Sequence, residues 1–132
     1  MKALNELVLP AEIKYTDEHI WARAQGDEIV VGISDFAQDQ LGEVMFVELP
    51  GEGDKFAAAE PFGVVESYKS VNKLFMPVSG EVVAVNSVLE DTPTLLNVSP
   101  YENGWIIKIK ADNAADLDGL LSADGYLAFL SK

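Results

Sequence analysis

The sequence predicts a mainly β protein, a sandwich or barrel, and three features indicate this class. Short runs of β-branched and aromatic residues recur along most of the chain. Turns that contain Gly or Pro separate these runs, which is typical of antiparallel sheets. Helical spacing is confined to one short segment after residue 33 and to the tail. With 132 residues and no low-complexity tract, the chain is expected to form one domain, residues 1–132.

A β-hairpin is expected near the N-terminal end. Residues 19–24 alternate in side-chain character, and residues 28–33 form a run rich in Val and Ile. Gln25-Gly26-Asp27 lies between the two runs, and both Gly and Asp favour tight turns. The two runs are therefore predicted to pair as antiparallel strands.

A short helix is expected directly after this hairpin. Ser34 and Asp35 both offer side-chain oxygens that can cap the first turn. Gln38 stands three residues after Asp35, as in a capping box, and Gly42 can end the helix in the left-handed region. These signals predict a helix of about two turns.

Further strands and a helical tail complete the predicted secondary structure. Apolar runs predict strands at residues 44–49, 62–66, 71–76, 81–85 and 105–110. Residues 50–53 contain Pro and Gly and are expected to end the first of these strands, at 44–49. Residues 113–121 and 122–130 are rich in Ala, Leu and Asp. We expect these two segments to form short helices that close the sheet edge or the barrel mouth.

The composition excludes several classes of function. The 22 acidic and 9 basic residues give a net charge of -13, which would repel nucleic acids and anionic membranes. The chain has no cysteine and a single histidine, His19, so neither thiol catalysis nor a Cys- or His-based metal site is expected. No stretch has the length and hydropathy of a signal peptide or a membrane span. We expect a cytoplasmic, monomeric protein without catalytic residues of its own.

The most informative segment is a lysine between two predicted strands. Lys69 lies between the runs at 62–66 and 71–76, so a hairpin turn would present it to solvent. A lysine in such a turn is by itself usually only a solvated side chain. Here, however, turn residues at 53–55 and 79–80 frame the two strands. This layout resembles the lipoyl and biotinyl carrier domains, in which a modified lysine occupies a hairpin turn of a flattened β-barrel.

Sequence blocks along most of the chain resemble, more narrowly, the H proteins of the glycine cleavage system. The blocks lie at 15–19, Trp21, 32–38, 41–44, 46–51, 65–70, 77–82, Asn86, Pro93, Leu95, 97–101 and 104–105. So many blocks in one order are far more specific than a lone Glu-x-x-Lys motif.

The resemblance implies a carrier that is not itself an enzyme. In this family, lipoate is attached in amide linkage to the lysine that matches Lys69. The implied partners are glycine decarboxylase, a pyridoxal-phosphate enzyme; aminomethyltransferase, a tetrahydrofolate enzyme; dihydrolipoyl dehydrogenase; and the enzymes that attach lipoate. The lipoyl-lysine would carry the aminomethyl group of glycine from the first enzyme to the second and be reoxidised by the third. The implied fold is a flattened β-barrel or sandwich hybrid with a short internal helix and short C-terminal helices.

Four residues near these motifs are candidates for a role in recognition or in holding the arm. Glu66 and Ser67 precede the lysine and are expected to serve recognition by the lipoate-attaching enzyme; alternatively, Glu66 faces solvent without a specific role. His19 and Trp21 belong to one matched block. They either line the surface on which the loaded arm rests or pack inside the protein, and the sequence favours packing.

Three alternative functions follow from the same residues. Biotin carriage is disfavoured, because the biotinyl family flanks its lysine with Met and this chain has Tyr68 and Ser70. A paralogue that serves another lipoyl relay is an alternative, because Tyr68, Ser70, Ile20 and residues 73–76 depart from the commoner family pattern. The third alternative is an unmodified interaction domain that has kept the fold without the arm.

Overall fold

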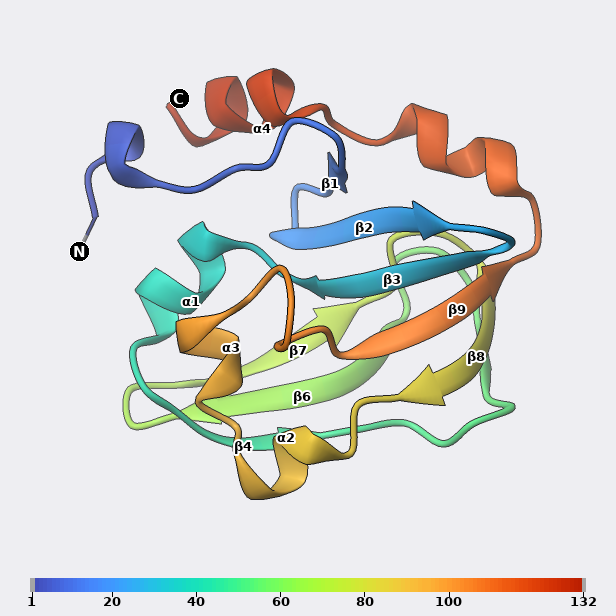
Figure 1. The fold of residues 1–132 in the computed structure, drawn as a ribbon, viewed down its shortest axis with the longest axis horizontal. Helices are drawn as coiled ribbons and strands as arrows, with labels where there is room; N and C mark the ends of the chain where they lie inside the picture. Colours follow the sequence, from blue (N-terminus) through green and yellow to red (C-terminus); the bar gives the residue numbers. More distant parts are fainter. Residues whose placement is uncertain (1, 132) are drawn as a thin grey trace.

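The computed structural model describes residues 2–131 and consists of two antiparallel sheets (Figure 1). The six-stranded sheet has the order β1-β2-β3-β9-β8-β5, with bounds β1 Lys14–Tyr15, β2 Ile20–Gln25, β3 Glu28–Ile33, β9 Ile107–Ala111, β8 Gly80–Val85 and β5 Lys55–Phe56. The three-stranded sheet has the order β4-β6-β7, with bounds β4 Val44–Glu48, β6 Pro61–Ser67 and β7 Val71–Phe75. The predicted mainly β fold is confirmed as two separate sheets, which over residues 2–131 do not close into one barrel.

The main hydrophobic core lies between the two sheets. Val47, Val65 and Leu74 contribute to it from the small sheet. Val31 and Ile107 contribute from the large sheet, and all five side chains are buried. Apolar burial of this kind contributes about 25 cal/mol per Å² of area removed from water, so it is the main force that joins the sheets.

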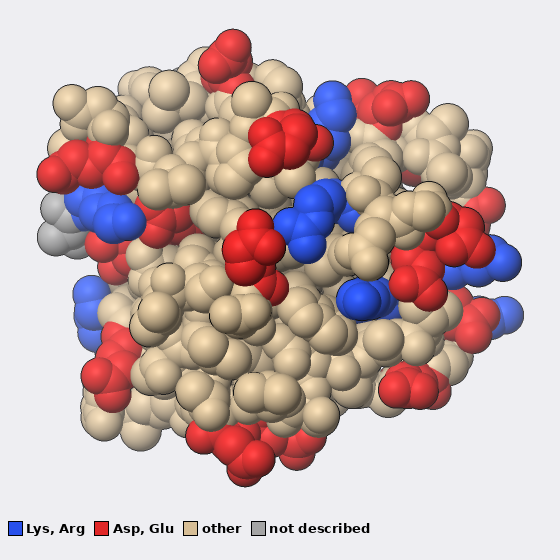
Figure 2. Space-filling model, viewed as in Figure 1, with Lys and Arg blue, Asp and Glu red and all other residues tan. Residues whose placement is uncertain are grey.

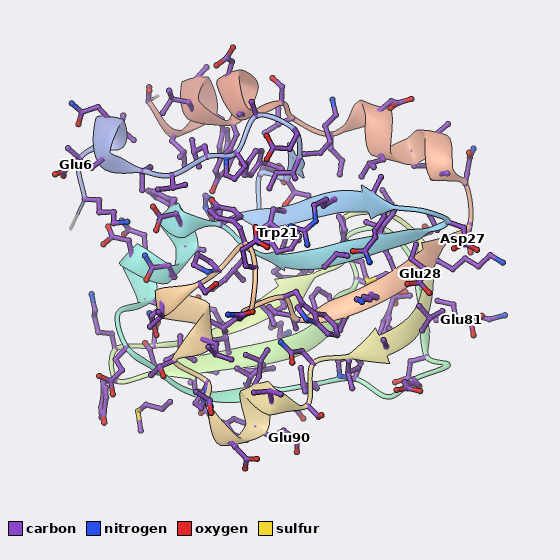
Figure 3. The ribbon with its side chains drawn as sticks, in the orientation of Figure 1. Glu6, Trp21, Asp27, Glu28, Glu81 and Glu90 are labelled. Atoms are coloured by element: carbon purple, nitrogen blue, oxygen red, sulfur yellow. The ribbon has the colours of Figure 1, made fainter. Side chains whose placement is uncertain are left out.

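The predicted hairpin is confirmed as β2 and β3. The two strands pair from Ile20↔Ile33 to Gln25↔Glu28. Gly26 closes the turn with a φ of 64°, a conformation that favours glycine. The turn lies at the end of the hairpin where Figure 3 labels Asp27 and Glu28.

Both faces of this hairpin are buried near its start. Ile20 and Ala22 belong to the core between the sheets. Trp21 points to the other face and joins a second buried cluster with Tyr15 and Tyr126. The cause is a third layer, formed by the N-terminal segment and the C-terminal helix, which covers this side of β2 (Figure 1).

The tail forms the two short helices that the sequence predicts. They are a 3₁₀ helix at Ala114–Gly119 and the α-helix α4 at Ala123–Leu130. Between them, Leu121 and Tyr15 exchange two backbone hydrogen bonds of 2.8 Å, so the tail covers the edge strand β1. On α4, the ring of Tyr126 stacks on that of Tyr15 at a centroid distance of 4.8 Å.

The predicted internal helix is confirmed as α1, Asp35–Leu41, with Ser34 as its N-cap. The predicted capping box is wrong: Nε2 of Gln38 donates to Oδ1 of the Asp35 side chain at 2.7 Å. Gly42 ends the helix with a φ of 74°, as expected, but its ψ of -158° lies outside the left-handed helical region. The chain therefore leaves α1 extended, toward β4.

Asp35 ties the N-terminal segment to α1. Its carboxylate accepts hydrogen bonds from Nζ of Lys2 and from the backbone N–H of Val8, both at 2.8 Å. Burial acts to raise the pKa of Asp35, but the hydrogen bonds from Lys2, Val8 and Gln38 outweigh it and the pKa is lowered. The carboxylate is therefore ionised at neutral pH and lies favourably at the N-terminal end of α1.

Several short elements have no counterpart in the sequence-based prediction. Two helical turns, α2 at Val88–Asp91 and α3 at Leu95–Val98, follow β8, and a 3₁₀ turn at Leu4–Glu6 begins the chain. The strands β1 and β5 have two residues each. Elements this short contain too few residues to show a hydrophobic period in the sequence. Their conformation therefore depends on tertiary contacts that the local sequence does not reveal.

The charged residues are spread over the surface. On the face seen in Figure 2, acidic side chains are scattered among fewer basic ones, and an uncharged area extends over the lower half. Within residues 2–131, no helix has the length and apolar character needed to cross a membrane. Across the same range, no group of three or more His, Cys, Asp or Glu side chains is placed to hold a metal ion.

Candidate functional site

The turn between β6 and β7 presents Lys69 to solvent. The strands end at the pair Glu66↔Val71, and the backbone N–H of Ser67 donates to the carbonyl of Ser70 at 2.9 Å. Tyr68 and Lys69 therefore occupy the corner of a tight turn, and both are exposed. The sequence-based placement of the lysine in a hairpin turn agrees with this geometry.

Ser67 holds the turn from beneath. Its side chain is buried, and its Oγ accepts from the backbone N–H groups of Lys69 at 3.2 Å and Ser70 at 3.3 Å. A serine hydroxyl that accepts from the next residues in this way stabilises a turn without glycine. The Ser67 side chain therefore acts on the backbone of the turn.

The Lys69 side chain extends over Gly42, at the end of α1. A Cβ atom built on Gly42 would lie 3.1 Å from Cε and 3.8 Å from Nζ of Lys69. Among the described residues, the Lys69 ammonium group makes neither a hydrogen bond nor an ion pair. The lysine is thus supported along its stem, while its amine stays free to react.

Asn97 positions the segment beneath the lysine. Its Oδ1 accepts from the backbone N–H of Val44 at 2.9 Å, and its Nδ2 donates to the carbonyl of Gly42 at 2.7 Å. A single side chain on α3 thereby fixes the link between α1 and β4. Sequence reasoning assigned no role to Asn97, because nothing in the local sequence indicates a contact with a residue 55 positions away.

Glu66 lies on the side of the small sheet opposite to Val65. It is half-buried and pairs with Phe46 on one side and Val71 on the other. Neighbouring residues in a strand point to opposite faces, so Glu66 faces outward while Val65 enters the core. Glu66 and Ser67 thus precede the lysine but point in different directions, and the Glu66 side chain is the more exposed of the two.

A cavity of about 610 Å³ adjoins the lysine turn. Ser70 and Val71 line its end next to the turn, and Glu18 and His19 line another part of its wall. The remaining lining is mostly apolar and includes Ile20, Ile33, Phe36, Leu41, Val65 and Leu74, with Lys73 as its one Lys or Arg. The cavity can therefore accommodate a flexible, mainly apolar group attached close to the turn.

His19 belongs to the wall of this cavity. It adopts a φ of 67°, and its Nδ1 lies 2.8 Å from the hydroxyl of Tyr126. Burial lowers the pKa of His19, against a smaller opposing effect of the Asp17 carboxylate. The imidazole is therefore neutral near pH 7 and adds no charge to the cavity.

Trp21 has a purely internal position. It is fully buried, and its Nε1 donates to the carbonyl of Pro100 at 2.9 Å. A Cβ on Gly32 would lie 2.7 Å from the indole ring, so the glycine leaves room for it. Packing describes Trp21 fully, whereas His19 both packs and lines the cavity.

Ser67→Ala is expected to loosen the lysine turn while preserving the fold. The change removes the acceptor for two backbone N–H groups, and we expect a loss of about 1 kcal/mol in the free energy of unfolding. Urea unfolding would measure this loss, and amide hydrogen exchange at Lys69 and Ser70 should become faster. Ser131→Ala is the matched control, because that hydroxyl donates to a carbonyl at the exposed end of α4. Unchanged exchange at Lys69 in Ser67→Ala would contradict the role given to Ser67.

Comparisons with known proteins agree on one family. The family model described as "Glycine cleavage H-protein" matches residues 13–132. A "Glycine cleavage system H protein" of Bacteroides fragilis is 52% identical over 122 residues, which is 92% of this chain and 97% of that protein. One of Symbiobacterium thermophilum is 53% identical over 124 residues, 94% of this chain and 97% of that protein. The crystal structure of a glycine cleavage system H protein from Mycobacterium marinum is similar with a TM-score of 0.85 and 33% identity, covering 94% of this chain and all of that one.

Proposed function

Because the chain belongs to the glycine cleavage H-protein family, we propose that it is a lipoyl carrier of the glycine cleavage system, with lipoate attached to Lys69. The observation that carries this assignment is the position of Lys69 in an exposed turn with a free ammonium group. Membership of the family supports the carrier role, and the exposed turn supports Lys69 as the attachment point. Carriage of lipoate requires no catalytic residue in the chain itself.

The residues around Lys69 fit a lipoyl group. An extended lysine joined to lipoate reaches on the order of 15 Å from the backbone, long enough to enter a partner's active site. Amide formation removes the lysine charge, so the arm can enter an apolar pocket at little desolvation cost. The group would supply the dithiolane chemistry, while Ser67 holds the turn and Gly42 leaves room for the lysine stem.

The proposed partners are the enzymes that load the arm and those that act on it. They are a lipoate-attaching enzyme, glycine decarboxylase, aminomethyltransferase and dihydrolipoyl dehydrogenase. The chain would meet them in turn, as a cytoplasmic monomer and as one domain over residues 1–132. The net charge of -13 favours transient docking on basic surfaces, and such docking weakens as the salt concentration rises.

A second candidate function is carriage in another lipoyl relay. Ile20 and Lys73, two positions that depart from the commoner family pattern, both line the cavity beside the turn. An aminomethyl cargo bears an ammonium group, which the Glu18 carboxylate in the wall would attract and Lys73 would repel. Because Ile20 adds no charge to this wall, the described lining residues attract an ammonium group less than a wall with more carboxylates would, and this favours a cargo without that charge. Both candidates require lipoate on Lys69 and differ only in the cargo.

Two measurements test the proposal. Intact mass of the protein from lipoate-replete cells should show one lipoyl amide, and peptide mapping should place it at Lys69. The loaded protein should then support glycine–bicarbonate exchange with purified glycine decarboxylase. A biotinyl amide or an unmodified Lys69 would refute lipoyl carriage. A lipoylated protein that is inactive in the exchange would favour the second candidate.

A further inference from the structure

Four exposed apolar side chains surround the lysine turn and form what we call the turn patch: Met45, Phe46, Tyr68 and Val71. Their exposed fractions are 50%, 51%, 74% and 64%. A register shift in β4 between Val44 and Phe46 accompanies the exposure of both Met45 and Phe46. Exposed apolar residues gathered on one site commonly mark an interaction surface.

The turn patch is continuous with Lys69. Phe46, Glu66 and Val71 lie side by side across the three strands of the small sheet, because Glu66 pairs with both of the others. Tyr68 directly precedes Lys69 in the turn that joins β6 to β7. A protein that contacts the backbone around Lys69 therefore also covers the patch.

The rim of the turn patch is acidic. Glu43 and Glu48 flank Met45 and Phe46 along the chain, and both are exposed. Glu66 lies between Phe46 and Val71 within the patch. A basic residue, Lys73, also lies near the patch. It is on the edge strand β7, where it pairs with Val64 of β6. The complementary surface is thus an apolar depression with Lys or Arg at its border.

The proposed partners differ in how closely their active sites must approach the lysine turn. The enzymes that act on the dithiolane meet it at the end of an arm of about 15 Å, so their active sites need not approach the turn. The enzyme that forms the amide must bring its active site to Nζ, which is about 6 Å from Cα in an extended lysine. Only this enzyme is compelled to contact residues adjacent to Lys69.

We propose that the turn patch is the docking surface for the lipoate-attaching enzyme. This inference rests on the proposed function, since it assumes that Lys69 is the attachment site. In the step served by docking, the deprotonated Nζ attacks the carboxyl carbon of an activated lipoyl donor, a mixed phosphate anhydride or a thioester. The new N–C bond forms, the bond from that carbon to the leaving group breaks, and the amine releases one proton.

The test compares loading with later use of the arm. Phe46→Thr and Val71→Thr keep β-forming residues on exposed positions, so both variants should fold. With a lipoate ligase, lipoate and ATP, we expect kcat/KM for loading to fall about tenfold in Phe46→Thr and about threefold in Val71→Thr, as for the loss of apolar interface contacts. Val8→Thr is the matched control, because Val8 is 57% exposed in the N-terminal segment, and it should load at the wild-type rate.

A second readout assigns the effect to the attaching enzyme. Variants loaded to completion by prolonged incubation should be reduced by dihydrolipoyl dehydrogenase at the wild-type rate when NADH supplies the electrons, which is the reverse of the enzyme's role in the cycle. Wild-type loading rates in Phe46→Thr and Val71→Thr, or equal losses in both assays, would overturn the inference while leaving the carrier function intact. A wild-type protein that takes up no lipoate would refute the carrier function itself.

Discussion

Lys69→Arg is expected to abolish loading with lipoate and to leave the fold intact. Arginine keeps the charge and the length of the side chain, but its guanidinium does not lose its proton in proteins and cannot form the amide. The Lys69 ammonium has no partner among the described residues, so the substitution should change the free energy of unfolding by no more than about 0.5 kcal/mol. Intact mass after incubation with lipoate ligase should show no addition, and glycine–bicarbonate exchange should fall to the background rate.

Lys110→Arg is the matched control for this experiment. Lys110 is an exposed lysine on β9, in the large sheet, so its replacement should leave both loading and exchange unchanged. Loading of Lys69→Arg at the wild-type level, or its loss in Lys110→Arg, would show that the arm is attached elsewhere. A fall in melting temperature of Lys69→Arg by several degrees would contradict the free position of the ammonium group.

The turn and its lysine could be predicted from the sequence because the signals are local. Apolar runs on both sides of residues 67–70 are long enough to show strand character, and the break between them has few ways to fold. The same applies to the β2–β3 hairpin, whose turn contains Gly26 at a positive φ. Local patterns therefore located both the lysine turn and the first hairpin.

The support of the site could not be predicted, because it depends on contacts between distant parts of the chain. Asn97 reaches Gly42 from α3, and four-residue helices such as α3 carry no periodic signal. The expected capping box fails for a similar reason. Gln38 binds the Asp35 carboxylate, which the N-terminal segment also holds through Lys2. Only the folded structure brings these partners together.

The third layer, formed by the N-terminal segment and α4, could be predicted only in part. The sequence favours packing for Trp21, and the ring is fully buried because α4 and the N-terminal segment cover that face of β2. The tail was expected to close an edge or a mouth, and it does cover the edge strand β1 through Leu121. What the sequence did not indicate is that Tyr126 of this tail bonds to the N-cap of α1.

Tyr126→Ala is expected to cost about 3–5 kcal/mol in the free energy of unfolding. Tyr126 is fully buried and stacks on Tyr15. Its hydroxyl lies 2.7 Å from Oγ of Ser34 and 2.8 Å from Nδ1 of His19. Burial raises the pKa of Tyr126 to about 12, so the hydroxyl keeps its proton across the physiological range.

Tyr126→Phe separates the ring from the hydroxyl. It keeps the stack on Tyr15 but leaves Ser34 and His19 without a shared partner, so we expect a smaller loss of about 1–3 kcal/mol. Urea unfolding of both variants, followed by fluorescence and by circular dichroism, gives the two values. Equal losses in Tyr126→Phe and Tyr126→Ala would assign the whole effect to the hydroxyl, and a loss below about 1 kcal/mol in Tyr126→Ala would show that α4 does not hold the third layer. Because Ser34 caps α1 and Gly42 ends it beneath Lys69, we expect the alanine variant to loosen the link between α1 and β4 as well. Faster hydrogen exchange at Val44, whose N–H donates to Asn97 in this link, would show the effect.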